Sequence, residues 1–102
     1  MDKTEALNIA QRYTNVLKNT FDLKKVILFG SYAKGNPRED SDIDIAVVFS
    51  GYANRLDQQV ELMKLTRKID TRIEPHPFRE EEFKMSNPFV NEIMTYGTEI
   101  VS

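Results

Sequence analysis

The sequence contains no cysteine and no tryptophan, and only one histidine among its 102 residues. The absence of cysteine excludes a disulfide framework and a thiolate zinc site. The longest apolar run, residues 45–49, is far shorter than the span of about 20 residues that a transmembrane helix needs. The first residues lack the basic and then apolar order of a signal peptide. We therefore expect a cytoplasmic protein without a membrane partner.

A strong excess of charge of one sign is also missing. The chain has 14 lysine and arginine residues against 16 acidic residues, which gives a formal net charge of −2. Direct binding of nucleic acid through a general electrostatic attraction is therefore not expected. Hydrophobic residues make up 40% of the chain and charged residues 29%, the balance of a folded protein. The length predicts a single domain over residues 1–102.

Helical periodicity, capping residues and β-rich runs divide the chain into elements. Asp2 is expected to cap a first helix that ends near Asn19, and Asn87 to cap the last helix. Helices are predicted at residues 3–19, 56–69 and 88–97, short helical turns at 32–35 and 79–83, and strands at 26–29, 43–49, 71–74 and 98–101. This order predicts an α/β (α+β) fold in which a small mixed β-sheet packs against helices.

Two local patterns carry further expectations about packing. The apolar stripe of Leu56, Val60 and Met63 is spaced as on one helical face, so we expect it to lie in the core. Pro75 and Pro77 follow the third strand, and we expect them to end it because proline donates no backbone hydrogen bond.

The most informative stretch runs from Gly30 to Asp44. Gly30 and Ser31 end one predicted strand, and ten residues later Asp42 and Asp44 begin the next. Two carboxylates at alternate positions of a strand share a face and repel each other unless a cation lies between them. Hard oxygen ligands of this kind suit Mg²⁺, while a glycine and a serine hydroxyl allow phosphate oxygens to approach the backbone. The combination predicts a magnesium–nucleotide site for phosphoryl or nucleotidyl transfer.

This stretch resembles the signature of the DNA polymerase β-type nucleotidyltransferases, which is Gly-Ser, ten residues and Asp-x-Asp. Within that superfamily the chain resembles the minimal nucleotidyltransferases (MNT), from the first helix to Gly97. The resemblance implies a palm-like core, two Mg²⁺ ions and a nucleoside triphosphate, commonly ATP. It implies that Asp42 and Asp44 hold the metals and that Gly30 and Ser31 bind the triphosphate.

The resemblance also implies a third carboxylate on a later strand, which helps to bind one metal and activates the attacking hydroxyl. Glu74 fits this role best by its position late in the third predicted strand. Asp70, four residues earlier on the same nominal face, is the alternative. Glu74 is otherwise a surface acid that pairs with Arg72 or Arg79. Many members of the superfamily carry aspartate here, so the longer glutamate bears on catalytic competence.

Other residues near the motif have less specific signals. Lys34 and Arg38 in the intervening loop offer positive charge to a triphosphate, and the alternative is that both are solvated. Tyr32 is expected to pack against the domain, with stacking near the nucleotide as the alternative. Ser41 is expected to shape the turn into the second strand or to orient an aspartate. His76 is expected to have a local structural role, and contact with substrate near Glu74 is the alternative.

The absence of a second domain points to a partner protein. Minimal nucleotidyltransferases of this kind pair with a HEPN-family toxin that cleaves RNA, and the resemblance implies an antitoxin that transfers AMP from ATP to a tyrosine of that toxin. One alternative is a catalytically weak or inactive antitoxin that neutralises its partner by binding. Another is a nucleotidyltransferase that modifies a small molecule such as an aminoglycoside. Exposed aromatic residues near the C-terminus, among Phe78, Phe83, Phe89 and Tyr96, would mark a protein interface.

Overall fold

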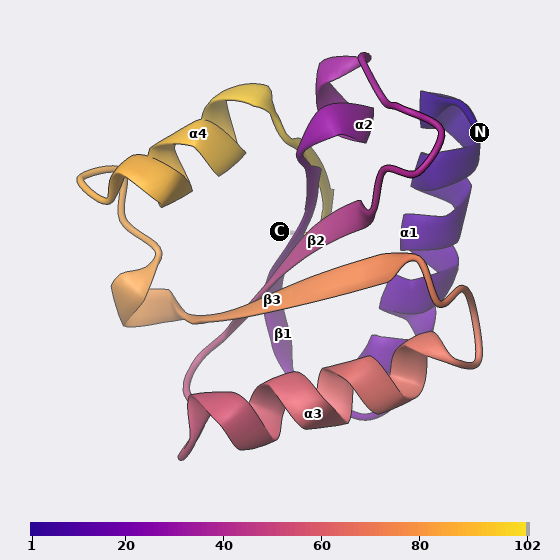
Figure 1. Cartoon of the computed structure of the whole chain (residues 1–102). Coiled ribbons are helices and arrows are strands. Elements are labelled where there is room, and N and C mark those ends of the chain that lie inside the picture. The colour runs from indigo at the N-terminus through magenta and orange to yellow at the C-terminus, as the bar shows by residue number, and fades with distance from the viewer. Residues whose placement is uncertain (102) are drawn as a thin grey trace.

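The computed structural model describes residues 1–101 and contains a four-stranded sheet with helices on both faces (Figure 1). This is the mixed α/β architecture that the order of predicted elements indicates. The elements are α1 (Lys3–Lys18), β1 (Leu23–Phe29), α2 (Ser31–Lys34), β2 (Ile43–Phe49), α3 (Arg55–Thr66), β3 (Ile73–Arg79), the 3₁₀ helix η1 (Glu80–Glu82), α4 (Pro88–Tyr96) and β4 (Thr98–Val101). Within residues 1–101, no helix combines the length and the hydrophobicity that crossing a bilayer requires.

Side chains that accept backbone hydrogen bonds begin the three long helices. The Asp2 carboxylate accepts from the N–H of Glu5 at 2.9 Å and begins α1. Asn54 does the same for α3, and Asn87 accepts from the N–H of Phe89 at 2.9 Å at the start of α4. The predicted caps at Asp2 and Asn87 are therefore confirmed, and they satisfy N–H groups that have no partner within the helix.

The strand order β3-β2-β1-β4 brings together residues that are distant in the sequence. β1 runs antiparallel to β2 and to β4, whereas β2 and β3 are parallel and are joined through α3. The register places Asp44 of β2 opposite Phe29 of β1 on one side and opposite Glu74 of β3 on the other. Residues paired across neighbouring strands share a face of the sheet, so Asp44 and Glu74 project from the same face.

The third strand continues through its prolines, so the prediction that they end it was wrong. β3 covers Ile73–Arg79, which includes both Pro75 and Pro77. It is an edge strand, and a proline is tolerated there when its nitrogen faces away from the neighbouring strand. The carbonyls on that outer side have other partners. Gln59 donates to the carbonyl of Pro75 at 2.8 Å and the Tyr52 hydroxyl to that of Pro77 at 3.4 Å.

The two faces of the sheet have different covers. α1 and α3 pack on one face, where the buried Tyr13 of α1 donates to the carbonyl of Leu62 in α3 at 2.7 Å. α4 packs on the face that carries Asp44, Glu74 and His76. The core against α1 and α3 is the larger one, and its strand residues are Val26, Leu28, Ile43, Ile45, Val47, Phe49 and Ile73. The smaller core under α4 leaves part of this face uncovered, and Asp44, Glu74 and His76 project there.

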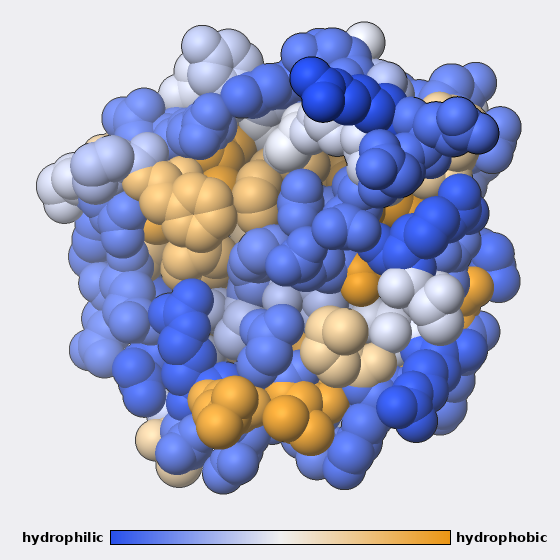
Figure 2. Space-filling model, in the orientation of Figure 1, coloured by the Kyte–Doolittle hydropathy of each residue, from blue (hydrophilic) through white to orange (hydrophobic). Residues whose placement is uncertain are grey.

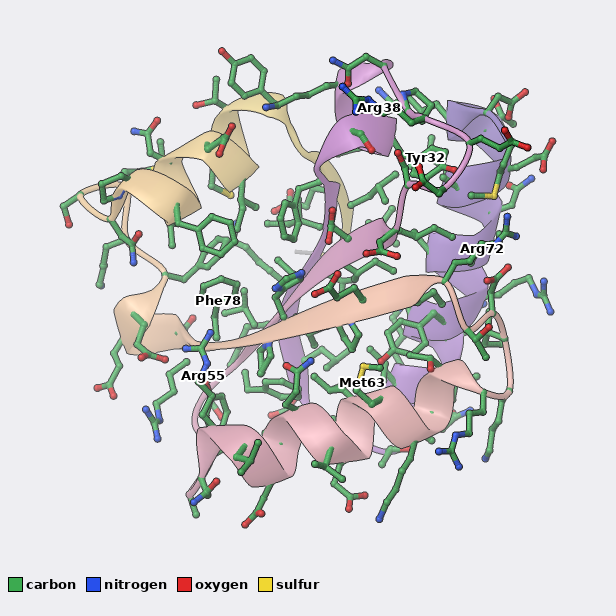
Figure 3. The ribbon with its side chains drawn as sticks, in the orientation of Figure 1. Tyr32, Arg38, Arg55, Met63, Arg72 and Phe78 are labelled. Atoms are coloured by element: carbon green, nitrogen blue, oxygen red, sulfur yellow. The ribbon has the colours of Figure 1, made fainter. Side chains whose placement is uncertain are left out.

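The helix α3 turns a different side to the core from the one we predicted. Leu56, Val60 and Met63 are 70%, 45% and 39% exposed, whereas Leu62 and Thr66 are buried. Both sets have helical spacing, so periodicity alone does not select between them. Figure 2 shows strongly hydrophobic atoms on the surface over α3, and Figure 3 shows Met63 on the same helix. The stripe that the sequence predicts as core is thus an apolar strip in contact with solvent.

Candidate functional site

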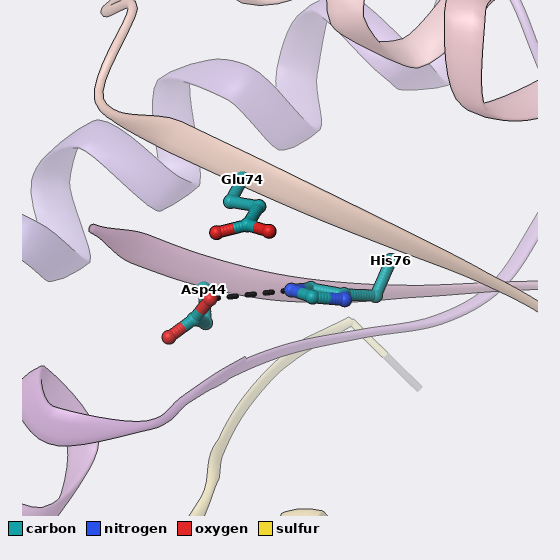
Figure 4. A group of neighbouring side chains, drawn as sticks. All are labelled: Asp44, Glu74 and His76. Carbon is teal, nitrogen blue, oxygen red and sulfur yellow. Dashed lines mark hydrogen bonds and ion pairs between the residues drawn. The ribbon is translucent and has the colours of Figure 1, made fainter.

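Asp44, Glu74 and His76 come together on one face of the sheet (Figure 4). Asp44 projects from β2, and the other two residues occupy alternate positions of the adjacent strand β3. One ligand atom from each residue lies within 4.8 Å of the others. His76 Nε2 lies 3.2 Å from Asp44 Oδ1, so the imidazole bonds to the carboxylate and orients it. Carboxylate oxygens and an imidazole nitrogen at this separation form a donor set that suits a divalent cation.

Asp42 adds a third carboxylate to this region. It lies one residue before β2 and lines a cavity of about 350 Å³ together with Glu74. Asp42 is exposed, whereas Asp44 is half-buried beneath the Gly30 turn. Asp42 therefore approaches Glu74 from the solvent side of the site, and Asp44 approaches it from the inner side.

The crowding of carboxylates affects Glu74 directly. Partial burial raises the pKa of the Glu74 carboxyl, and a hydrogen bond with Asp42 raises it further. Repulsion from Asp44 and Asp42 acts in the same direction, while the nearby His76 lowers the pKa. A raised pKa means that the ionised form is disfavoured, which is the situation that a bound cation relieves. It also brings the carboxylate closer to the proton affinity that a general base needs.

Gly30 brings the backbone against the Asp44 carboxylate. It has φ of +77°, a left-handed conformation that favours glycine, and a Cβ at this position would overlap Asp44 Oδ2. The next residue, Ser31, begins the short helix α2, and the N–H of Lys34 donates to the carbonyl of Gly30 at 3.1 Å. The first turn of a helix presents N–H groups without intrahelical partners. The Gly30–Ser31 turn can therefore offer backbone donors to an anion beside Asp44.

The basic residues of the loop are placed differently from each other. Lys34 Nζ lies 2.8 Å from Glu92 Oε1 and 5.0 Å from the centre of the Tyr96 ring, so it links α2 to α4. It also lines a cavity of about 200 Å³ together with Phe29 and Gly30. Arg38 lies exposed in the loop that precedes β2. Both predicted phosphate ligands are therefore exposed, Lys34 beside Gly30 and Arg38 in the loop.

Tyr32 and Ser41 have structural contacts. Tyr32 is buried in the core cluster beside α1, which confirms the prediction that it packs against the domain. The Ser41 hydroxyl accepts from the N–H of Arg38 at 2.8 Å and closes the turn before β2. Of the two roles considered for Ser41, the structure therefore supports the shaping of the turn.

Asp70, the alternative third carboxylate, is engaged elsewhere. It precedes β3 and forms a two-pronged pair with Arg72, in which Nε donates at 3.0 Å and Nη2 at 2.7 Å. These hydrogen bonds hold the pKa of the Asp70 carboxyl below its usual range. The structure thus places Glu74, and not Asp70, beside Asp44.

The sequence interpretation missed His76 as a member of the cluster. Its bond to Asp44 joins residues 32 positions apart, and its ring centre also lies 5.0 Å from that of Phe29. The signal was the alternation of Glu74 and His76, which puts both on one face if the strand continues through Pro75. A strand that ends at Pro75 would not include His76, so the sequence prediction did not place His76 on the same face as Glu74.

Comparisons of the sequence with known proteins identify its family. A family model described as polymerase beta, nucleotidyltransferase, matches residues 11–102. Two relatives from Methanocaldococcus jannaschii carry names that make them candidate protein adenylyltransferases. The first is 37% identical over 68 residues, which cover 65% of this chain and 67% of the relative. The second is 30% identical over 90 residues, which cover 85% of this chain and 86% of the relative.

Solved structures share the fold. A toxin–antitoxin structure with AMP-PNP superposes with a TM-score of 0.64 at 24% identity, covering 90% of this chain and 71% of the other. A tri-AMPylated HEPN toxin from Shewanella oneidensis in complex with its MNT antitoxin gives a TM-score of 0.55, also at 24% identity, and the match covers 87% and 70% of the two chains. At this level of identity the likeness is one of fold.

Proposed function

Because this chain belongs to the polymerase β nucleotidyltransferase family, we propose that it transfers AMP from ATP to a hydroxyl group of a partner protein. The acceptor is a tyrosine of a HEPN-type toxin, and the chain is the antitoxin of that pair. The observation that carries the proposal is the convergence of Asp42, Asp44 and Glu74 beside the Gly30–Ser31 turn. Carboxylates next to backbone phosphate donors are the parts that nucleotidyl transfer requires.

The carboxylates fit divalent cations because a cation removes the repulsion that raises the pKa of Glu74. Asp42, Asp44 and Glu74 would hold two Mg²⁺ ions, which when bound neutralise charge on the triphosphate and on the attacking oxygen. His76 holds the Asp44 carboxylate in place through its 3.2 Å bond. In this proposal residues 1–102 form a single domain, which supplies the groups that bind the cations and the nucleotide.

The transfer itself exchanges one phosphorus–oxygen bond for another. The tyrosine oxygen bonds to the α-phosphorus of ATP, the bond from that phosphorus to the bridging oxygen breaks, and pyrophosphate leaves. Glu74, beside the site of the attacking oxygen, accepts the proton of the tyrosine hydroxyl. Gly30 and Ser31 bind the departing phosphates through backbone N–H groups and the serine hydroxyl, and Arg38 adds positive charge from the loop. Lys34, which lines a cavity together with Gly30, adds a second positive charge.

The names of the related proteins support the choice of acceptor. Two relatives are candidate protein adenylyltransferases, which favours a protein over a small molecule as the acceptor. One structural neighbour contains AMP-PNP, an ATP analogue, and another is an AMPylated HEPN toxin bound to its antitoxin. These two complexes support ATP as the donor and a HEPN protein as the partner.

The proposal is tested by intact-mass spectrometry of this chain purified with the protein encoded beside it. With ATP and Mg²⁺ the partner should gain mass in whole AMP units. Asp42→Asn and Asp44→Asn should each slow the transfer by at least about a hundredfold, because loss of a ligand exceeds the usual effect of losing its supporting contacts. Asp40→Asn is the matched control, since it removes an exposed acid from the same loop and should leave the rate unchanged.

The other outcomes separate the remaining functions. A stable complex whose partner keeps its mass under every condition would show an antitoxin that acts by binding alone. Absence of both complex and modification would contradict a protein acceptor and would favour a small-molecule nucleotidyltransferase.

A further inference from the structure

Two neighbouring cavities lie along the exposed side of α3, next to the start of β3. The cavity that contains Asp42 and Glu74 is also lined by Gln59, Met63 and Thr71. A neighbouring cavity of about 420 Å³ shares those three residues and extends further along the helix. We define the α3 groove by the residues of this second cavity, which are Gln59, Val60, Met63, Lys64, Thr66, Arg67 and Thr71. The α3 groove therefore adjoins the cavity that contains Asp42 and Glu74.

The groove lies on the side of the site opposite to the Gly30 turn. In the sheet, Asp44 has β1 and the Gly30 turn on one side and Glu74 of β3 on the other. Figure 3 shows Met63 on the α3 side of β3, and Tyr32 and Arg38 of the α2 region beyond the opposite side of that strand. In nucleotidyl transfer the attacking and the leaving oxygen lie in line across the phosphorus. Phosphates bound at the Gly30 turn therefore require an acceptor that arrives from the α3 side.

The surface around the groove indicates what it accepts. The exposed strip of Leu56, Val60 and Met63 leads along α3 to the groove, and contiguous exposed apolar side chains mark protein contacts. The groove is lined by two cationic side chains: Arg67, and Lys64, which also pairs with Glu61 outside the lining at 3.4 Å. A segment with an apolar side chain flanked by acidic residues complements these features. The apolar strip and the net charge of −2 favour protein over nucleic acid.

We propose that the acceptor protein docks a segment carrying apolar and acidic residues in the α3 groove, and that this segment passes Met63 to bring its tyrosine hydroxyl to Glu74. The inference rests on the proposed function and adds the surface that selects the acceptor. The strip on α3 would then be covered in the complex, which accounts for its exposure in the isolated chain.

The first test compares two exposed methionines. Met63→Glu places a negative charge in the groove, whereas Met85→Glu places one at an exposed methionine outside its lining. With the coexpressed partner as acceptor, Met63→Glu should raise KM for the partner by at least about tenfold, as for the loss of a central interface contact. KM for ATP should stay unchanged, and Met85→Glu should behave as the unmodified chain. Equal transfer by the two variants would overturn the proposal, and thermal denaturation checks that both are folded.

A second test does not depend on catalysis. A photo-crosslinking residue, p-benzoylphenylalanine, is placed at Val60 or at Met85 in the Asp42→Asn background, and the complex with the partner is irradiated. Crosslinking to the partner from Val60 and not from Met85 would support the docking surface. This result does not require AMP transfer, so a failure of the proposed function can be distinguished from a failure of the docking surface. Crosslinking from Met85 alone, or from Val60 to RNA alone, would overturn it.

Discussion

At the scale of single residues, Asp44 joins four parts of the site. It is paired in register with Glu74, bonded to His76, covered by Gly30 and two residues from Asp42. The spacing of Gly-Ser and Asp-x-Asp was enough to predict that these residues belong to one site, because they lie at the ends of two successive strands. The contact with His76 crosses strands and depends on the register of β3, which local spacing does not encode.

The grouped carboxylates lead to a prediction about pH and stability. Because the pKa of Glu74 is raised, the folded protein binds this proton more tightly than the unfolded chain does. The resulting stabilisation is complete below the ordinary glutamate pKa of about 4.3 and is lost as the pH rises through the raised value. Without metal, the midpoint of thermal unfolding of the unmodified chain should therefore fall relative to that of Glu74→Gln as the pH rises over this range.

Mg²⁺ should reverse that loss at neutral pH because it replaces the missing proton as the positive partner. Thermal denaturation with and without Mg²⁺ measures the effect, which should vanish in Glu74→Gln. Glu81→Gln, which changes an exposed acid outside the cluster, should respond as the unmodified chain. An equal response to Mg²⁺ in the Glu74→Gln and Glu81→Gln variants would argue against a cation at this site.

At the scale of elements, capping residues predicted where helices begin, but neighbouring elements decided which faces are buried. Asn87 followed by Pro88 has a local physical reason to begin α4. The face that α3 buries depends on α1 and β3, which pack against it from distant parts of the chain. Leu62 and Leu56 both fit helical spacing, so the choice between them is a tertiary one. The continuation of β3 through Pro75 likewise depends on its place at the sheet edge.

The orientation of α3 predicts that truncating two of its apolar residues changes the free energy of unfolding by different amounts. Leu62→Ala should lower the free energy of unfolding by about 2–4 kcal/mol, because Leu62 is fully buried and its removal leaves a cavity. Val60→Ala should change it by no more than about 0.5 kcal/mol, because Val60 is 45% exposed. Urea denaturation measures both. A larger loss for Val60 than for Leu62 would mean that the helix buries the other face.

At the scale of the whole molecule, the sheet separates a structural layer from the layer that holds the site. α1 and α3 bury the larger core on one face, and the other face holds α4 beside the carboxylate cluster. The order of elements predicted a mixed sheet packed against helices, and this is confirmed. β2 pairs antiparallel with β1 after the connection that contains α2, and parallel with β3 after the crossover through α3, and this central position of β2 cannot be read from local sequence.

The contact between α1 and α3 should make the structural layer sensitive to alkaline pH. Burial raises the pKa of the Tyr13 phenol above its usual range, and its hydroxyl donates to the carbonyl of Leu62. As the pH rises above the ordinary tyrosine value of about 10, the unfolded chain loses this proton before the folded protein does, so the free energy of unfolding falls.

Tyr13→Phe tests the same contact. It should lower the free energy of unfolding at neutral pH by about 1–2 kcal/mol, since the carbonyl of Leu62 loses its buried donor. The variant should also lose less stability between neutral and alkaline pH than the unmodified chain. Chemical denaturation over that range measures both effects, and an unchanged alkaline slope would contradict the assignment.

β3 forms one edge of the sheet and carries proline at two alternate positions. Many proteins recruit a partner by adding one of its strands to such an edge, because exposed backbone groups continue the hydrogen-bond ladder. Pro75 and Pro77 offer no N–H, and Gln59 and Tyr52 already occupy their carbonyls. Strand addition is thereby blocked at β3. This edge is protected against aggregation between copies, and recognition along it is left to side chains.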